Sequence, residues 1–386
     1  MKILIIADNL KTKNSGGAER SLLNLIKGFK QYQNIILKVI TNRNLPFLEI
    51  TNYIYFFKII KTIKKFKPDI ILTQRTIAFP SILCSLVTKV PIINIVRDLT
   101  HFCPKRMNII AYGKSCNLNI NKNQCFDCIN KWRTLRILIG NKRETYLDSF
   151  SAILHNIFYK IRYYFCRFNY WLLNKAKLNL VASDLMIRKL HNVDYSKIKT
   201  AKIIPFKTVN KRFNKTEKSN YLLFVSPFYD GSGKGKDFIK RLSKQLPENL
   251  RILNVGKEIE EKNIIDLGYV SKNDLDFIYQ KSKATLVPSF HTESFGRVIL
   301  ESIFNNTPVI CSSDCGVLEY IHHNSYAYQI PIDVMSWISI IKKLANENYQ
   351  IKTDVNSHLF AEFSVESCIR DLLEKIEEVL RNERRK

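Results

Sequence analysis

The sequence predicts an α/β protein built from two doubly wound domains, each with a parallel sheet. The chain has 386 residues, of which 46% are hydrophobic and 25% charged, and this suits two globular domains with separate cores. Short apolar, β-branched runs alternate with helical patterns along the chain, as in successive βαβ units. A polar stretch at 207–220, KTVNKRFNKTEKSN, separates two such series and is the predicted linker.

The expected elements follow this alternation from one end of the chain to the other. In the first half we expect strands at 2–8, 35–41, 70–74, 91–97, 178–182 and 202–205, with helices at 18–30, 50–67, 79–88 and 146–175. In the second half we expect strands at 221–226, 250–255, 264–269, 284–288 and 308–312, and two helices in the tail from 355 to 385. Two doubly wound halves place a ligand crevice at the carboxyl ends of both sheets, hence between the domains.

Charge is distributed very unevenly between the two halves. Residues 1–208 hold 36 of the 61 basic and 10 of the 34 acidic residues, so they carry +26 of the net +27. We therefore expect the first half to face an anionic partner, either acidic lipid head groups, a lipid-diphosphate acceptor or nucleic acid. The opening KILIIAD is too short for the apolar core of a signal peptide, and no run reaches the roughly 18 apolar residues of a spanning helix. These features predict a cytoplasmic protein, peripheral on the inner face of the cytoplasmic membrane.

The segment PSFHTESFGRVILESIFNNTPVI, at 288–310, is the richest in candidate functional residues. Ser294 is a suitable N-cap for a helix that begins at Phe295 or Gly296, and Gly296 allows backbone to approach a ligand closely. The exposed N–H groups at such a helix start suit a phosphate. Glu293 and Glu301 bracket this position, where they can accept hydrogen bonds from sugar hydroxyls. An ordinary capped helix with solvated glutamates is the alternative interpretation of these residues alone.

Seven residues separate Glu293 from Glu301, and the context P-S-x-x-x-E-S-F-G-x-x-x-x-E followed by TPVI resembles the E-x7-E motif of retaining glycosyltransferases of family four. The resemblance implies a GT-B fold, with two Rossmann-like domains facing across a donor-binding cleft. It implies that Glu301 holds the nucleotide ribose and that Glu293 contacts the donor sugar. It further implies a hexosyltransferase that moves a sugar from a UDP- or GDP-sugar to a glycan or lipid-linked acceptor, in cell-surface polysaccharide or glycolipid synthesis.

The resemblance extends to loops in both halves. Gly16 and Gly17 resemble the family's N-terminal glycine loop beside the donor phosphates, and Lys234-Gly235 resembles its diphosphate-binding Lys-Gly, with Lys236 as a close rival. Many family members have His-Asp after a first-domain strand, but here the sequence is Arg97-Asp98, and His101 follows nearby. The resemblance implies retaining transfer without an enzyme nucleophile and without a required cofactor. The expected catalytic residues are Glu293, Lys234, Asp98 and Arg97. The expected donor-binding residues are Gly16, Gly17, Lys234, Glu293, Phe295, Gly296, Arg297 and Glu301.

The predicted domains are an acceptor-binding domain at 1–208, a sugar-nucleotide-binding domain at 209–365, and a C-terminal helix at 366–386 that packs back on the first domain. A Cys-rich insertion at about 99–145 contains Cys103, Cys116, Cys125 and Cys128. Four thiolates within such a segment can hold a structural zinc, although only the last pair has C-x-x-C spacing, and buried free thiols or disulfides are the alternatives.

One segment of the first half, YKIRYYFCRFNYWLLNK at 159–175, mixes cations with aromatic residues. This composition is typical of the boundary between water and lipid, while a helix packed on the sheet with its basic side in water is the alternative. We expect an anionic membrane surface as a partner and no nucleic acid. A non-catalytic GT-B scaffold, a basic nucleic-acid-binding protein and a sugar-nucleotide epimerase remain the competing functions.

Overall fold

The computed structural model describes the chain apart from several short ranges of residues. The residues that are not described are 9–16, 43–52, 106–115, 117–120, 140–145, 193–199, 203–216, 226–231, 313, 322–325, 347–362 and 386. The chain divides into two compact units. The first contains Met1–Tyr112, Cys116–Thr208 and Phe363–Lys386, and most of the second is Val209–Glu362.

The first unit is a six-stranded parallel sheet in the order β2-β1-β3-β4-β5-β6. Its strands are β1 (Lys2–Asp8), β2 (Ile36–Asn42), β3 (Ile70–Gln74), β4 (Ile92–Ile95), β5 (Leu178–Val181) and β6 (Thr200–Lys202). Its longer helices are α1 (Gly17–Phe29), α2 (Phe56–Phe66), α3 (Ala78–Thr88), α4 (Lys122–Ile139), α5 (Tyr146–Leu173), α6 (Asp184–His191) and α12 (Val365–Arg384). All residues of β3 and β4 are buried, as expected for parallel strands that helices cover on both faces.

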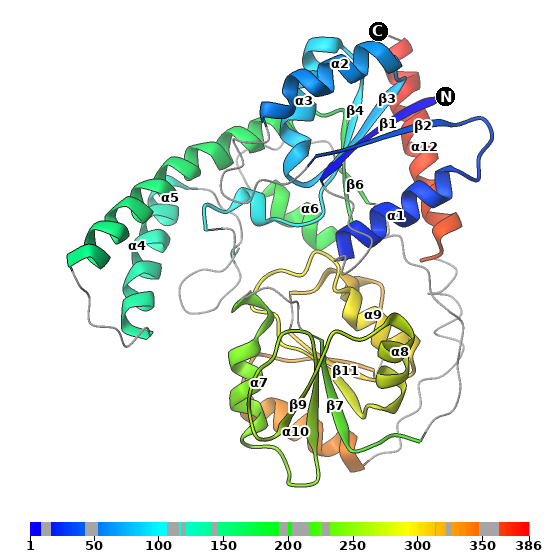
Figure 1. Cartoon of the computed structure of the whole chain (residues 1–386). Helices are drawn as coiled ribbons and strands as arrows, with labels where there is room; N and C mark the ends of the chain where they lie inside the picture. The colour runs from blue at the N-terminus through cyan, green and yellow to red at the C-terminus, as the bar shows by residue number, and fades with distance from the viewer. Residues whose placement is uncertain are drawn as a thin grey trace. The chain divides into compact units, whose positions relative to one another are not determined.

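Each face of this sheet has its own apolar core. One core combines Leu4 and Ile6 of β1 with residues of α2, α3 and α5, including Ile59, Ile82 and Tyr170. The other core packs the opposite side chains of β1 against α1 and α12, which lie side by side in Figure 1. At this contact a Cβ on Gly28 of α1 would lie 2.5 Å from Ile369 Cγ1 of α12, so only glycine lets the two helices approach this closely.

The second unit is also a six-stranded parallel sheet, in the order β12-β11-β10-β7-β8-β9. Its strands are β7 (Tyr221–Val225), β8 (Arg251–Val255), β9 (Ile264–Gly268), β10 (Ala284–Val287), β11 (Val309–Cys311) and β12 (Ala327–Gln329). Its helices are α7 (Lys236–Ser243), α8 (Lys272–Lys281), α9 (Arg297–Phe304) and α10 (Val334–Asn346). The main core of this unit lies around Trp337 of α10, which is fully buried against Phe238 of α7 with ring centroids 4.9 Å apart.

The positions of most predicted elements agree with the structure to within a few residues. Some departures are larger: helix α6 and strand β12 were not predicted. The predicted insertion contains a helix that we did not anticipate, α4, and the helix expected at 50–67 is described only from Phe56. Of the two predicted tail helices, α12 is observed. The other falls within residues 347–362, which lie outside the described part. The computed fold contains no helix, within the described residues, that is both long and apolar enough to cross a membrane.

Candidate functional site

Each sheet has one place where the chain reverses the direction in which it adds strands. In the first unit this point lies between β1 and β3, and in the second it lies between β7 and β10. In doubly wound sheets, the loops at such a point generally diverge to opposite faces of the sheet and leave room for a ligand. In both units, charged side chains from these loops contact one another at this point.

In the second unit the two loops meet through Lys234 and Glu293. Lys234 ends a short 3-10 helix, η4 (Ser232–Lys234), in the loop after β7, and its Nζ donates a hydrogen bond to Glu293 Oε1. The same Oε1 accepts a hydrogen bond of 2.5 Å from Ser289 Oγ, and His291 Nε2 lies 3.7 Å away. Lys236, the rival for this role in the sequence, instead donates to the carbonyl of Glu258. Lys234 is therefore the lysine that faces the switch point.

The charge on Glu293 is held in place by these neighbours. Burial by itself would raise its pKa, but Lys234, His291 and the hydrogen bond from Ser289 outweigh burial and lower the pKa of Glu293 from 4.5 to about 2. Only 13% of the side chain is exposed, so the interaction with Lys234 takes place largely out of bulk water. Glu293 is consequently a fixed anion at neutral pH, and it cannot act there as a proton donor.

Backbone approach explains the glycine that follows Lys234. Gly235 has a φ of 81°, and a Cβ at this position would lie 2.2 Å from the carbonyl oxygen of Pro288. The loop after β7 can therefore lie against the loop after β10 only with glycine here. The N–H of Phe290 also donates to the Gly233 carbonyl at 2.8 Å, which joins the two loops a second time.

The start of α9 differs from the prediction. Ser294 does not cap the helix; α9 begins at Arg297, and Gly296 is its N-cap with a φ of 89°. The reason is that the segment before Gly296 is paired in an extended conformation with the chain after β11. Glu293 forms a parallel bridge with Cys315, and the Phe295 carbonyl accepts a hydrogen bond of 2.6 Å from the Val317 N–H. The helix can begin only after this pairing ends.

The remaining donor-site candidates lie on or beside α9. Phe295 is buried and its ring packs on Tyr320 with centroids 5.8 Å apart. Glu301 lies one helical turn after Arg297, and its Oε2 accepts a hydrogen bond of 3.4 Å from the hydroxyl of the fully buried Tyr279. Burial and the nearby Glu301 carboxylate raise the pKa of Tyr279 well above its ordinary value, so it remains a hydrogen-bond donor. Tyr279 thus orients the Glu301 carboxylate.

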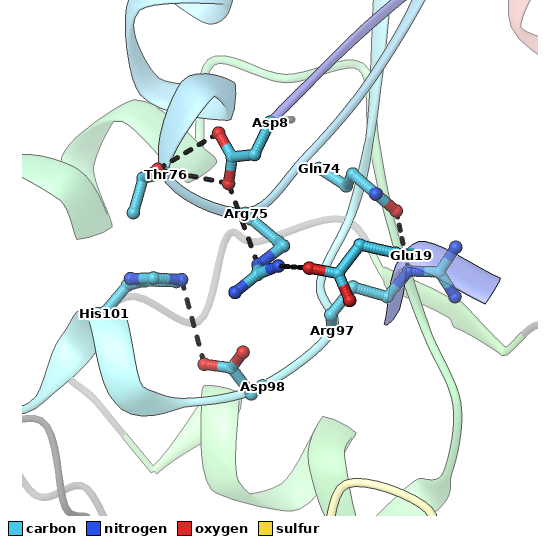
Figure 2. A network of polar contacts seen from close by, with 8 residues as sticks. All are labelled: Asp8, Glu19, Gln74, Arg75, Thr76, Arg97, Asp98 and His101. Atoms are coloured by element: carbon cyan, nitrogen blue, oxygen red, sulfur yellow. Dashed lines mark hydrogen bonds and ion pairs between the residues drawn. The ribbon is translucent and has the colours of Figure 1, made fainter. Parts of the chain in front are cut away.

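In the first unit, the switch point is occupied by a network that the sequence analysis did not identify (Figure 2). Asp8, the last residue of β1, is 5% exposed and accepts hydrogen bonds on both oxygens from Thr76 Oγ1. Arg75 follows β3, and its Nε lies 3.7 Å from Asp8 Oδ2 while its Nη1 donates to Glu19 Oε1 at 2.9 Å. Arg75 therefore bridges the end of β1 and the first turn of α1.

The backbone of Arg75 is strained. Its φ is 60°, in the left-handed region that a residue with a Cβ adopts only at a cost of about 1 kcal/mol. Burial disfavours the charged guanidinium, but Asp8, Asp98 and Glu19 outweigh it and raise the pKa of Arg75. Burial also raises the pKa of Asp8, and Arg75, His101 and Thr76 offset only part of this effect. Strained residues tend to lie at functional sites, which makes Arg75 a candidate.

The predicted Arg97 and Asp98 lie beside this network, after β4. Arg97 Nε donates to Gln74 Oε1 at 2.8 Å, and Asp98 Oδ1 lies 3.8 Å from His101 Nε2 (Figure 2). His101 is on a short 3-10 helix, η3 (Thr100–Phe102), and its ring packs edge-on against Phe79. The structure therefore brings Asp98 and His101 to the same switch point as Asp8 and Arg75. A strand-end Asp followed later by an Arg after the third strand is the signal that could have revealed this network.

Two other predictions have different outcomes. Gly16 lies outside the described residues, and Gly17 is the exposed first residue of α1.

All nine cysteines are free thiols. Burial raises the pKa of Cys125 to about 12, and its neighbours Cys103, Cys116 and Cys128 add to this effect. The four thiols are therefore close together, but within the described chain no group of three or more His, Cys, Asp or Glu side chains is arranged to hold a metal ion. The structure does not support the zinc prediction.

The match to a family model lies almost entirely within the second unit. Residues 206–356 match the model of the family described as "Glycosyl transferases group 1", and this range includes every residue of the Lys234–Glu293 site. A curated relative, an uncharacterised glycosyltransferase of Methanocaldococcus jannaschii, is 29% identical over 110 residues, which are 28% of this chain. These residues span 25% of that relative. Both matches therefore concern part of the chain, and the family-model match concerns residues 206–356.

Solved structures resemble the whole chain. HepE of Anabaena, in complex with UDP and glucose, is similar with a TM-score of 0.67 and 15% identity, over 98% of this chain and 99% of its own. Sucrose-phosphate synthase of Thermosynechococcus elongatus is similar with a TM-score of 0.68 and 12% identity, again over 98% of this chain and 99% of its own. At these identities the likeness concerns the fold, and it confirms the predicted GT-B fold with two Rossmann-like domains.

Proposed function

We propose that this protein is a retaining glycosyltransferase that moves a sugar from a nucleoside-diphosphate sugar to a glycan or lipid-linked acceptor. We further propose that it acts at the inner face of the cytoplasmic membrane, in the synthesis of a cell-surface polysaccharide or glycolipid. The observation that carries the proposal is the Lys234–Glu293 pair at the switch point of the second unit, inside the range that matches the family model. A UDP-sugar is the first donor to test, because HepE of Anabaena is described in complex with UDP-glucose.

In this proposal Lys234 binds the diphosphate of the donor, and Glu293 fixes the position of Lys234 while it accepts hydrogen bonds from the sugar. Among the described residues, Lys234 and Ser289 both donate hydrogen bonds to Glu293 Oε1. The other carboxylate oxygen, Oε2, is the one that we propose accepts from a hydroxyl of the ligand. Glu301, oriented by Tyr279, accepts hydrogen bonds from the ribose hydroxyls. Arg297 and the backbone N–H groups at the start of α9 add positive potential near the phosphates.

The transfer step that we propose uses no enzyme nucleophile. The bond between the anomeric carbon and the diphosphate oxygen breaks, and the acceptor oxygen bonds to the same face of the sugar ring. The acceptor proton passes to the departing phosphate oxygen, so the products are the glycosylated acceptor and the nucleoside diphosphate. Lys234, Arg297 and the start of α9 stabilise the negative charge that develops on the leaving group. Because Glu293 stays ionised, it contributes as a fixed charge that orients the sugar.

The first unit is the proposed acceptor-binding domain. Its switch-point network presents carboxylates and a guanidinium, the groups that accept from and donate to acceptor hydroxyls. Asp98 and Arg97 are the proposed catalytic groups there, because Asp98 is 38% exposed and can reach a ligand. The net charge of +26 in residues 1–208 favours an acceptor or membrane surface that carries negative charge.

A thermal-shift screen against UDP- and GDP-sugars tests the donor site. We expect one donor to stabilise the wild-type protein, and we expect Glu301→Ala to abolish this stabilisation. Glu248→Ala, an exposed glutamate of the same unit, is the matched control and should respond as the wild type does. A folded wild-type sample that no donor stabilises would contradict the proposal and favour a scaffold. With the donor known, the coupling constant of the anomeric proton in the product distinguishes retention from inversion.

A further inference from the structure

The water-facing side of α5 is apolar, and this is unusual for a long surface helix. Between Ile157 and Leu173 every exposed residue is aliphatic or aromatic. These residues, which we call the α5 stripe, are Ile157, Ile161, Tyr164, Phe168 and Trp171. They are between 39% and 63% exposed and are spaced four, three, four and three residues apart, so they form one continuous line along the helix.

The opposite side of the same helix is part of the first core. Tyr163, Cys166, Tyr170, Leu172 and Leu173 are buried there, and the ring of Tyr170 lies 4.7 Å from that of Phe102. With this side fixed in the protein, α5 can lie along a surface but cannot pass through one. Figure 1 shows the helix beside α4, with which it makes its main helix contact. From Ile157 to Trp171 the α5 stripe is about 21 Å long, at 1.5 Å per residue.

A second segment extends this surface. The ring of Tyr53, just before α2, contacts the rings of Phe165 and Phe168, with centroid separations of 5.9 and 6.4 Å. The neighbouring Ile54 and Phe57 are 70% and 80% exposed. Tyr53 therefore joins the segment that carries Ile54 and Phe57 to the α5 stripe. A contiguous exposed apolar surface of this kind marks an interaction site.

Cations border the α5 stripe. Lys160 lies three residues after Ile157 and four before Tyr164, and Arg167 lies three after Tyr164 and four before Trp171, so both are neighbours of the stripe on the helix surface. At its end, Lys175 Nζ lies 5.1 Å from the centroid of the Trp171 ring, which in turn stacks on Phe168. Aliphatic side chains at one end of the stripe, aromatic rings toward the other end and cations along its edge are the side chains that an anionic lipid interface favours.

We propose that the α5 stripe, together with Ile54 and Phe57, is a docking surface for an anionic lipid bilayer. Two copies of this chain are poor partners for each other here, since residues 1–208 of each copy carry +26. Nucleic acid offers negative charge but no hydrocarbon for Ile157 and Ile161 to enter. A bilayer that contains acidic phospholipids supplies both. The inference builds on the membrane part of the proposed function and assigns it to a particular face.

Vesicle sedimentation with the full chain tests this surface. The wild type should bind vesicles that contain phosphatidylglycerol and bind phosphatidylcholine vesicles only weakly, and added salt should reduce the difference. The double variant Ile161→Gln with Tyr164→Gln should lose about tenfold or more in partition onto the anionic vesicles. Phe277→Gln, which changes a 57% exposed aromatic residue on α8 of the second unit, is the matched control and should bind as the wild type does. Circular dichroism checks that each variant is folded.

Three results would overturn the assignment. Unchanged vesicle binding by the double variant would mean that another face docks, while the membrane proposal itself would stand. Absence of vesicle binding by the wild type, together with stripe-dependent self-association in ultracentrifugation, would make this face an interface between copies. Nucleic-acid binding that the double variant loses would assign the face to that partner instead. Donor-induced stabilisation, measured in the same samples, reports separately on the glycosyltransferase proposal, since neither substituted residue belongs to the donor site.

Discussion

Replacement of Lys234 by methionine tests the central interaction of the second unit. Methionine retains most of the apolar length of the side chain and removes the charge that Glu293 contacts. In the wild type, the pKa of Glu293 is lowered from 4.5 to about 2. One pKa unit corresponds to about 1.4 kcal/mol, so the groups around the carboxylate stabilise its ionised form by about 3 kcal/mol. Lys234 supplies the largest favourable part, and we expect Lys234→Met to lower the free energy of unfolding by about 2 to 3 kcal/mol at neutral pH.

The effect should depend on pH in a particular direction. A carboxyl group with a lowered pKa in the folded state stabilises that state above the pKa of the unfolded chain, here 4.5, and this contribution disappears as the pH falls toward 2. The variant lacks this contribution at every pH. The difference in unfolding free energy between wild type and variant should therefore be largest above pH 4.5 and shrink below it.

Urea denaturation followed by circular dichroism, repeated from neutral pH down to about pH 3, measures this difference. Lys236→Met is the matched control, because Lys236 is exposed to solvent at its contact with the Glu258 carbonyl and does not contact Glu293 among the described residues, and we expect a change of about 0.5 kcal/mol or less. Equal stability of the two variants would refute the assigned electrostatic role of Lys234. So would a difference in unfolding free energy between wild type and Lys234→Met that does not decrease as the pH is lowered. Donor-induced stabilisation should be lost in Lys234→Met and kept in Lys236→Met.

Three further changes test backbone conformation and the first-unit network. Gly235→Ala should destabilise the protein by about 3 kcal/mol, because the new Cβ would meet the Pro288 carbonyl oxygen. Gly268→Ala should destabilise it by about 1 kcal/mol, because Gly268 has a φ of 62° but open space around it. Thermal melts compare the two variants. Arg75→Gly should be about 1 kcal/mol more stable than Arg75→Ala in urea denaturation, because glycine adopts a φ of 60° without strain, and equal stability would contradict the strain. Burial raises the pKa of Asp8, so the ionised carboxylate lowers the stability of the fold as the pH rises. Arg75 offsets part of this effect, and the loss of unfolding free energy in Arg75→Ala should therefore grow from acidic to neutral pH. A loss that does not depend on pH would argue against the interaction of Arg75 with Asp8.

The sequence predicted the sheet strands well because their residues are apolar on both faces. KILIIAD and IILTQ are continuous runs of the kind that parallel strands require when helices cover both sides. Helix α4 was missed because its amino acids have no clear apolar stripe, and its position depends on packing against α5. The predicted start of α9 was one or two residues too early for a similar reason. Ser294 has the right chemistry for a cap, but the pairing of Glu293 with Cys315 is a contact between distant segments that a local pattern does not contain.

The donor-site residues were named from the E-x7-E spacing, and their roles stay predictions. Spacing cannot show that Lys234 rather than Lys236 faces Glu293, because this depends on the turn that Gly235 permits against Pro288. The spacing of the motif also did not indicate that Asp8 and Arg75 belong to the candidate site. Those two residues are 67 positions apart, and only the order β2-β1-β3 makes them neighbours. Topology, rather than composition, creates this part of the candidate site.

The place of α12 in the first unit has a consequence for how the chain is made. Strand β1 and helix α1 leave the ribosome early, but the residues that cover them, among them Ile369, Leu372 and Ile376, come more than 300 positions later. The surface that α12 covers on the sheet and on α1 stays exposed while the whole second unit is synthesised, and the second unit can complete its own core in the meantime. The first unit to begin synthesis is therefore the last to finish folding, and in that interval part of its apolar surface is open to aggregation.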